Sequence, residues 1–159
     1  MKLTNEQLKD LLELAFWVIV TFSVAAIASQ FEPGEWYMNI AKPSWTPPGW
    51  LFGPVWSILY FSMGVSVWLV WRKRHKTAVS WPLAFYLAQL AINGIWSWLF
   101  FGRQWIGLAL IDLVALVIMV VITIAMFLRI RETAGFLLLP YLLWISFAAA
   151  LNLQIYRMN

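Results

Sequence analysis

Residues 106–128 read IGLALIDLVALVIMVVITIAMFL, and this stretch decides the fold class. Asp112 is its only charged residue, and the apolar residues run on without the alternation of a barrel strand. A run of about 20 apolar residues is long enough to cross a bilayer as an α-helix. Four more such runs occupy residues 11–29, 51–71, 81–101 and 134–156. The sequence therefore predicts an all-α membrane protein, a bundle of five transmembrane helices.

The composition excludes a soluble fold. Of the 159 residues, 63% are hydrophobic and 11% are charged, and the mean hydropathy is +0.78; soluble domains carry about 25% charged residues. Five spans need about 100 residues, so we expect residues 1–159 to form a single transmembrane domain. Because the chain has no cysteine and one histidine, we expect no disulfide, no metal site and no cofactor.

The basic residues predict an orientation. A net charge of +4 in a membrane protein records topology more often than nucleic-acid binding, so we expect no nucleic-acid partner. An odd number of spans puts the termini on opposite sides. The face with the N-terminus then carries Lys2, Lys9, Arg72, Lys73, Arg74, Lys76, Arg129 and Arg131, and the other face carries Lys42, Arg103 and Arg157. The positive-inside rule predicts a cytoplasmic N-terminus in an inner membrane. Docking of the segment 72–76 on anionic lipids is the alternative interpretation of its charge.

One connection is long and rich in aromatic residues. Residues 30–50 read QFEPGEWYMNIAKPSWTPPGW. Disordered segments are poor in aromatic residues, and prolines fix φ and exclude helix from the residues before them. We therefore expect an ordered loop between the first and second helices, folded as a lid over the bundle. An aromatic segment lying on the lipid headgroups is the alternative.

Several motifs resemble those of the TspO/MBR family. They are the segments 36–37 (WY), 42–50 (KPSWTPPGW) and 53–56 (GPVW), followed by 88–93 (AQLAIN), 100–102 (FFG), 109–113 (ALIDL) and 139–144 (LPYLLW). The specific motif is the W-x-P-P element at 45–48, followed by Trp56 eight residues after Pro48. The later motifs are individually weak, but together they follow the family's order along nearly the whole chain. This family includes the bacterial tryptophan-rich sensory proteins and the mitochondrial translocator protein, which is also called the peripheral-type benzodiazepine receptor.

The resemblance implies a fold and a set of ligands. It implies five helices, a cavity capped by the first loop, frequent homodimers, and binding of porphyrins, sterols and benzodiazepine-site drugs. Trp56 and Trp144 match the family's cavity positions. Secondary matches are Tyr37, Pro47, Phe52, Asn93, Trp96, Ala148 and Leu151. The sterol motif departs from the family's pattern because Tyr156 and Arg157 are adjacent, which weakens the expectation of sterol binding.

Helical spacing assigns faces independently of the resemblance. At about 100° per residue, Ala84, Ala88 and Ala91 share one stripe, which is either a homodimer seam or a contact within one protomer. The opposite stripe holds Tyr86, Gln89, Asn93, Trp96 and Phe100, and its amides either line a cavity or join helices. Two further stripes are aromatic, and we expect them to meet around one hollow. They comprise Trp56, Tyr60, Met63 and Val67 in the second span and Tyr141, Trp144, Ala148 and Asn152 in the fifth.

Asp112 is the one carboxylate placed deep in a span, which makes it a candidate ligand-binding residue by default. We expect its partner to be Arg103 or an interior polar group. A structural role in tying helices together is equally consistent with its position.

The residue types favour ligand binding over conventional catalysis. No combination of nucleophile, base and orienting group is visible. An aromatic cavity suits a flat hydrophobic small molecule. A metal-free porphyrin fits this description, and its propionates could reach Lys42 or Arg103. We therefore predict a membrane receptor or sensor for tetrapyrroles. The alternatives are light-driven porphyrin oxidation through Trp56 and Trp144, and translocation of tetrapyrroles, sterols or lipids.

Overall fold

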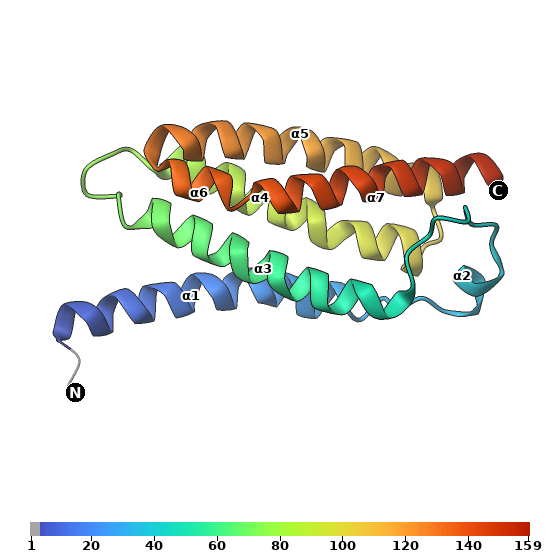
Figure 1. Ribbon diagram of the computed structural model, residues 1–159, viewed down its shortest axis with the longest axis horizontal. Coiled ribbons are helices and arrows are strands. Elements are labelled where there is room, and N and C mark those ends of the chain that lie inside the picture. The colour runs from blue at the N-terminus through green and yellow to red at the C-terminus, as the bar shows by residue number, and fades with distance from the viewer. Residues whose placement is uncertain (1–3) are drawn as a thin grey trace.

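The computed structural model describes residues 4–159, which contain α-helices, one π-helical turn and no strand. The elements are α1 (Asn5–Ala28), α2 (Glu35–Asn39), α3 (Gly49–Trp71), α4 (Ser80–Ser97), η1 (Trp98–Gly102), α5 (Ile106–Ile130), α6 (Glu132–Phe136) and α7 (Leu139–Met158). They form five segments long and apolar enough to cross a membrane. The predicted all-α, five-span bundle is confirmed, and its helices lie roughly side by side along one axis (Figure 1).

Helix α1 packs closely against α3 and begins with a defined cap. The Thr4 side chain accepts a hydrogen bond from the main-chain nitrogen of Gln7, and the Gln7 side chain accepts one from Thr4, which satisfies amides that the first turn leaves free. Further along, a Cβ added to Gly64 of α3 would lie 3.0 Å from the Cα of Val18. The glycine therefore permits backbone contact between α1 and α3, as small residues do in membranes.

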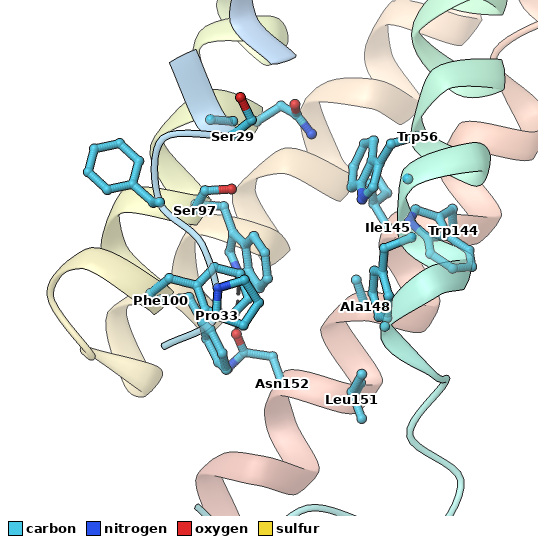
Figure 2. Close-up of a pocket in the computed structure, with 18 of the residues that line it drawn as sticks. Ser29, Pro33, Trp56, Ser97, Phe100, Trp144, Ile145, Ala148, Leu151 and Asn152 are labelled. Carbon is cyan, nitrogen blue, oxygen red and sulfur yellow. Dashed lines mark hydrogen bonds between the residues drawn. The ribbon is translucent and has the colours of Figure 1, made fainter. Parts of the chain in front are cut away.

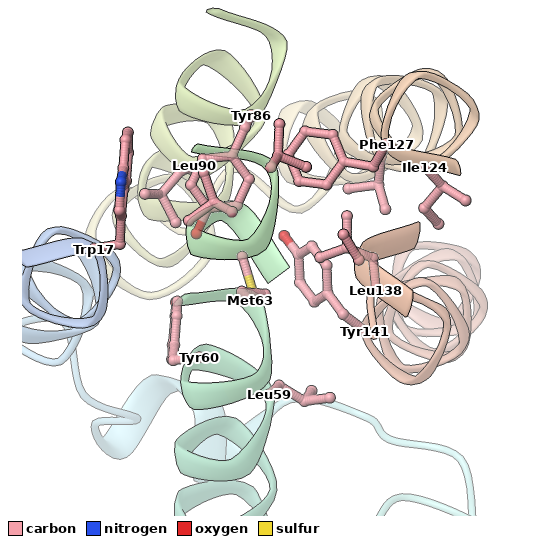
Figure 3. Close-up of a cluster of buried hydrophobic side chains, with 14 of the residues drawn as sticks. Trp17, Leu59, Tyr60, Met63, Tyr86, Leu90, Ile124, Phe127, Leu138 and Tyr141 are labelled. Carbon is pink, nitrogen blue, oxygen red and sulfur yellow. The ribbon is translucent and has the colours of Figure 1, made fainter. Parts of the chain in front are cut away.

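The larger of two buried hydrophobic clusters joins α1, α3, α4, α5 and α7 (Figure 3), and a smaller one around Phe100 and Leu151 lies near the lid. Tyr86, Tyr141, Phe127 and Met63 are fully buried in the larger cluster. The tyrosine hydroxyls are satisfied: that of Tyr86 lies 2.7 Å from Thr21 Oγ1, and that of Tyr141 donates to Gln89 Oε1 over 3.1 Å. Since an unpaired hydroxyl in hydrocarbon is costly, these bonds let large aromatic rings fill the axis of the bundle.

Two spans depart from the single regular helices that the apolar runs predict. The fifth span is divided at residues 137–138 into α6 and α7, and Pro140 follows in the first turn of α7, where its missing N–H costs nothing. The third span ends in the π-helical turn η1. A continuous run of apolar residues shows that a segment can span the membrane. It does not show where the helix is interrupted or changes to π-helical hydrogen bonding.

The end of α3 and the junction of α5 with α6 lie at the same end of the bundle as the N-terminus (Figure 1), and these segments carry Arg72, Lys73, Arg74, Lys76, Arg129 and Arg131. Lys2 lies outside the described residues. Two of the arginines are neutralised by α1: Arg74 forms a two-point ion pair with Glu13 at 2.6 and 3.1 Å, and Arg72 pairs with Asp10 at 2.9 Å. The segment 72–76 thus connects α3 to α1 through ion pairs. This structural role was not part of the prediction from sequence, which assigned the segment to membrane orientation.

Candidate ligand cavity

A cavity of about 940 Å³ lies in the bundle beneath residues 30–50. Its walls come from α1, α3, α4, η1, α5 and α7, and the loop after α1 covers it. Figure 2 shows Trp56, Trp144 and Ala148 on one side of the space, with Ser97, Phe100 and Pro33 on the other. Helices α3 and α7 make few contacts with each other. Aromatic side chains of both helices project into the space between them.

Aromatic contacts hold the wall formed by α3 and α7. The rings of Trp56 and Tyr60 stack with centroids 5.3 Å apart and planes 28° from parallel. Phe52 of α3 meets Trp144 of α7 edge to face at 5.7 Å. Phe52, Trp56 and Tyr60 sit one helical turn apart on one face of α3, so each turn contributes one ring to the cavity.

A second wall is built on α4 and η1. Trp96 and Phe100 stack with centroids 5.1 Å apart. The Trp96 indole is fixed because Nε1 donates to Asn152 Oδ1 over 3.2 Å, while the Asn152 amide nitrogen donates to the carbonyl of Ile106 over 2.9 Å. Asn152 therefore positions one face of the cavity by joining α4, α5 and α7.

The cavity floor carries a polar pair. The Tyr60 hydroxyl donates to Asn93 Oδ1 over 2.5 Å, and both residues line the cavity. Because the carbonyl end of the Asn93 side chain is engaged by Tyr60, its amide nitrogen keeps donor capacity. Leu113, Leu116 and Ile145 complete the floor.

The loop 30–50 is an ordered lid, as predicted. Trp36 and Tyr37 of α2 pack edge to face on Phe100, and Trp45 packs on Phe147 of α7. This contact also buries the Tyr37 hydroxyl, and burial raises its pKa. The π-helical turn η1 thus serves as the platform on which the lid rests.

Two polar anchors fix the lid further. Lys42 Nζ donates to the carbonyls of Tyr37, Met38 and Ile40, at 2.5, 3.2 and 3.0 Å, and so closes the end of α2. The side-chain amide of Asn159 exchanges two hydrogen bonds of 3.0 Å with the main chain of Ala41. The lid is therefore held to α7 as well as to η1.

Nine of the predicted site residues line the cavity, and they are those that match the family's positions: Tyr37, Pro47, Phe52, Trp56, Asn93, Trp96, Trp144, Ala148 and Leu151. Gln89 and Tyr141 do not line it. They are 1% and 0% exposed and bonded to each other in the core below the floor. Their helical faces are as expected, but they lie one turn too deep.

Asp112 does not line the cavity either. Its expected partner Arg103 lies over the rings of Trp98 and Trp105, and within residues 4–159 no ion pair joins it to Asp112. One Asp112 oxygen is buried without a hydrogen-bond partner among the described residues. Arg103 does not line the cavity.

Sequence reasoning missed the contribution of α1. Phe22, Ala25 and Ser29 line the cavity from that helix, and Phe31 follows in the lid. Their spacing of three to four residues was a usable signal, but these residue types are equally common on lipid-facing surfaces.

The cavity can bind and stack, but the described residues offer it no metal site. Residues 4–159 contain no group of three His, Cys, Asp or Glu side chains able to hold a metal ion. Rings on facing walls can enclose a flat molecule by burial and offset stacking, and the Asn93 amide can orient it.

These features define the chain as a multi-pass helical membrane protein with a lidded, aromatic cavity. It belongs to the TspO/MBR family, whose model matches residues 14–157. It is 39% identical over 153 residues to the tryptophan-rich protein TspO of Archaeoglobus fulgidus, covering 94% of this chain and 99% of the relative. It is 39% identical over 140 residues to the human translocator protein, with 84% and 82% covered, and 36% identical over 135 residues to the tryptophan-rich sensory protein of Cereibacter sphaeroides, with 85% and 84% covered.

Proposed function

We propose that this protein is a membrane receptor that binds a porphyrin or a similar flat hydrophobic molecule in the cavity under the lid. The observation that carries this proposal is the enclosure of a space of about 940 Å³ by Trp56, Trp96, Trp144 and their aromatic neighbours. Ligand sites of about 300–1,000 Å³ with mainly apolar walls and few polar groups are typical for organic ligands. If ligand binding changes the conformation of the lid or the association of protomers, the protein acts as a sensor in tetrapyrrole regulation.

A titration of purified protein tests this proposal. Metal-free porphyrin added to the protein in detergent micelles should quench tryptophan fluorescence saturably, since ligand rings would lie against cavity tryptophans. A sterol and haem serve as comparison ligands, because the cavity offers stacking surfaces and the described residues offer no cluster for a metal. Quenching that rises linearly with porphyrin and never saturates would contradict specific binding.

Light-driven oxidation of bound porphyrin, with dissolved dioxygen as the oxidant that accepts the electrons, is a second candidate function. It is favoured by the presence of two tryptophans, Trp56 and Trp144, on the wall of one cavity. Illumination of the complex should then bleach the porphyrin absorbance. Trp144→Phe should abolish the bleaching more completely than it weakens binding, since phenylalanine keeps a ring but is far harder to oxidise. Bleaching that persists in this variant would exclude Trp144 as the required residue, and bleaching of the wild-type complex no faster than that of free porphyrin would leave the protein a binding receptor alone.

We further propose that the N-terminus lies in the cytoplasm and that the membrane is the inner one. The basic residues gathered at the N-terminal end of the bundle support this orientation. Single cysteines introduced at His75 and Asn39 in the cysteine-free chain should react differently in intact cells. A membrane-impermeant thiol reagent should label position 39 only. Labelling of position 75 with protection of position 39 would reverse the orientation.

A homodimer is proposed through the outer face of α4. Ala84, Ala88 and Ala91 are all exposed, which argues against a contact within one protomer, and small residues permit close helix approach in lipid. Ala88→Leu should weaken self-association in micelles, measured by cross-linking or sedimentation, while porphyrin binding persists. Ala125→Leu, on the exposed face of α5, is the matched control. An unchanged dimer in Ala88→Leu would place the seam elsewhere.

A further inference from the structure

Helices α1 and α3 are in contact along only part of their length. Where they pack closely, a Cβ added to Gly64 of α3 would lie 3.0 Å from the Cα of Val18 in α1. Gly53 lies on the same face of α3, about three helical turns nearer the lid. Apart from its own helix, a Cβ added to Gly53 would meet no atom within 4 Å. The two helices therefore diverge toward the lid.

The gap between the diverging helices opens into the cavity. Among the described residues, the aromatic pair of α1 and α3 nearest the lid is Phe22 with Tyr60, whose ring centroids are 5.9 Å apart. Beyond this pair, both helices present small residues that line the cavity and are also exposed. They are Ala26, Ser29, Gly53 and Ser57. Figure 2 shows Ser29 of α1 across the space from Trp56 of α3.

This gap lies at the depth of the bilayer. Both α1 and α3 are long and apolar enough to span a membrane. Ser57 lies about 12 Å along the helix axis from the start of α3, well inside a hydrocarbon core that is about 30 Å thick. The outer side of the gap therefore faces lipid chains.

The rim of the gap presents no free donor to a molecule that passes. The Ser57 hydroxyl donates to the carbonyl of Gly53 over 2.9 Å, and the Ser29 hydroxyl donates to that of Ala26 over 3.0 Å. Both protons are therefore satisfied within their own helices. Among the described residues, no hydrogen bond crosses from one border of the gap to the other. An apolar molecule can pass without breaking one.

The route through the lid requires more contacts to be broken. The lid packs on η1 through Trp36 and on α7 through Trp45. The side chain of Asn159 also exchanges two hydrogen bonds of 3.0 Å with the main chain of Ala41. Lifting the lid separates all of these groups, whereas passage between α1 and α3 leaves them in place.

We infer that flat hydrophobic ligands enter and leave the cavity from the bilayer, through the gap between α1 and α3, while the lid stays closed. This inference rests on the proposed function, because it concerns the access route of the same ligands. Helix α1 is the least buried of the five spans, and the ion pairs that attach it to the segment after α3 lie at its opposite end. The gap can therefore widen while α1 remains attached to the bundle.

An obstruction placed in the gap tests the route. Gly53→Phe adds a ring in the open space beside α3, and Ala26→Phe adds one from α1. A plug raises the barrier without changing either end state, so each variant should slow porphyrin association and dissociation by the same factor, about tenfold. Gly34→Phe is the matched control, since Gly34 lies in the lid, has equally open surroundings and does not line the cavity.

Both rates are followed by tryptophan fluorescence in protein reconstituted into lipid nanodiscs. Stopped-flow mixing with protoporphyrin IX gives association, and mixing of the complex with an excess of porphyrin-free vesicles gives dissociation. Asn159→Ala removes the hydrogen bonds that hold the lid to α7. It should leave both rates unchanged, because the lid is not the route.

Three results would overturn the inference while leaving the proposed function intact. The first is unchanged dissociation in both Gly53→Phe and Ala26→Phe. The second is an equal slowing in Gly34→Phe. The third is several-fold faster dissociation in Asn159→Ala, which would make the lid the exit. A wild-type titration that never saturates would instead reject the proposed function.

Discussion

Replacing Trp56 and Trp144 together with alanine should reduce porphyrin affinity at least about a hundredfold. Each indole offers a large apolar surface, and burying a large apolar side chain is worth about 1.5–3 kcal/mol. Stacking adds about 0.5–1.5 kcal/mol per aromatic pair. Even with partial non-additivity, two such losses exceed the 2.7 kcal/mol or so that a hundredfold change in affinity requires.

The double variant needs a control that removes two tryptophans without touching the cavity. Trp81→Ala/Trp105→Ala serves, because both side chains are exposed and neither lines the cavity. Its porphyrin affinity should stay near that of the wild-type protein. The single variant Trp144→Phe should lose several-fold to tenfold, since it retains a ring. Normal affinity in Trp56→Ala/Trp144→Ala, with loss in the control, would place the ligand on the lipid-facing surface.

Most of the fold could be predicted from the sequence, because the length of an apolar run is set by the thickness of the bilayer. The five spans and the ordered lid depend on composition, and composition is fully visible. The break at residues 137–138 and the π-helical turn η1 were not predictable in this way. Both are changes of backbone register inside segments that remain apolar throughout.

The limits of the site prediction have a different cause. A helical projection gives the direction of a side chain but not the depth at which the bundle closes. Gln89 precedes Asn93 by four residues, or about 6 Å along the axis. That one turn separates the cavity floor from a core filled by the Gln89–Tyr141 pair. Asp112 fails for a related reason: its expected partner Arg103 is held by two tryptophans, a competition that no single-helix pattern reveals.

The hydrogen bonds of Lys42 could not be predicted from the sequence either. As a lone cation beside an aromatic cavity, it was a reasonable partner for a propionate. The structure gives its donors to three lid carbonyls within five residues of it in sequence. Local main-chain satisfaction thus takes precedence over ligand recognition, because the carbonyls at the end of a short helix lack partners of their own.

Replacing Arg74 with methionine should lower the free energy of unfolding by about 2–3 kcal/mol. Its guanidinium makes two hydrogen bonds to Glu13 and lies 4.4 Å from the centroid of the Trp71 ring. Both side chains of the pair are only 18% exposed. Removing one partner of a largely buried pair leaves the other charge uncompensated, which costs about 3–5 kcal/mol at full burial.

The neighbouring pair supplies the matched control for this measurement. Arg72 and Asp10 join the same two segments, but their side chains are 40% and 44% exposed, so Arg72→Met should cost no more than about 1 kcal/mol. Arg74→Lys should fall between the two, because lysine keeps the charge but loses the two-point geometry. Unfolding by SDS in micelles, followed by circular dichroism, measures all three.

The double variant Glu13→Leu/Arg74→Met separates the pair from the packing of the arginine stem. It should recover much of the stability lost in Arg74→Met, because no charge is left without a partner. Helix α1 is the least buried of the five spans and also forms one wall of the ligand cavity, so its attachment to the bundle bears on both stability and binding. Equal losses in Arg74→Met and Arg72→Met would show that burial does not distinguish the pairs and that α1 is held by its apolar contacts with α3 and α4.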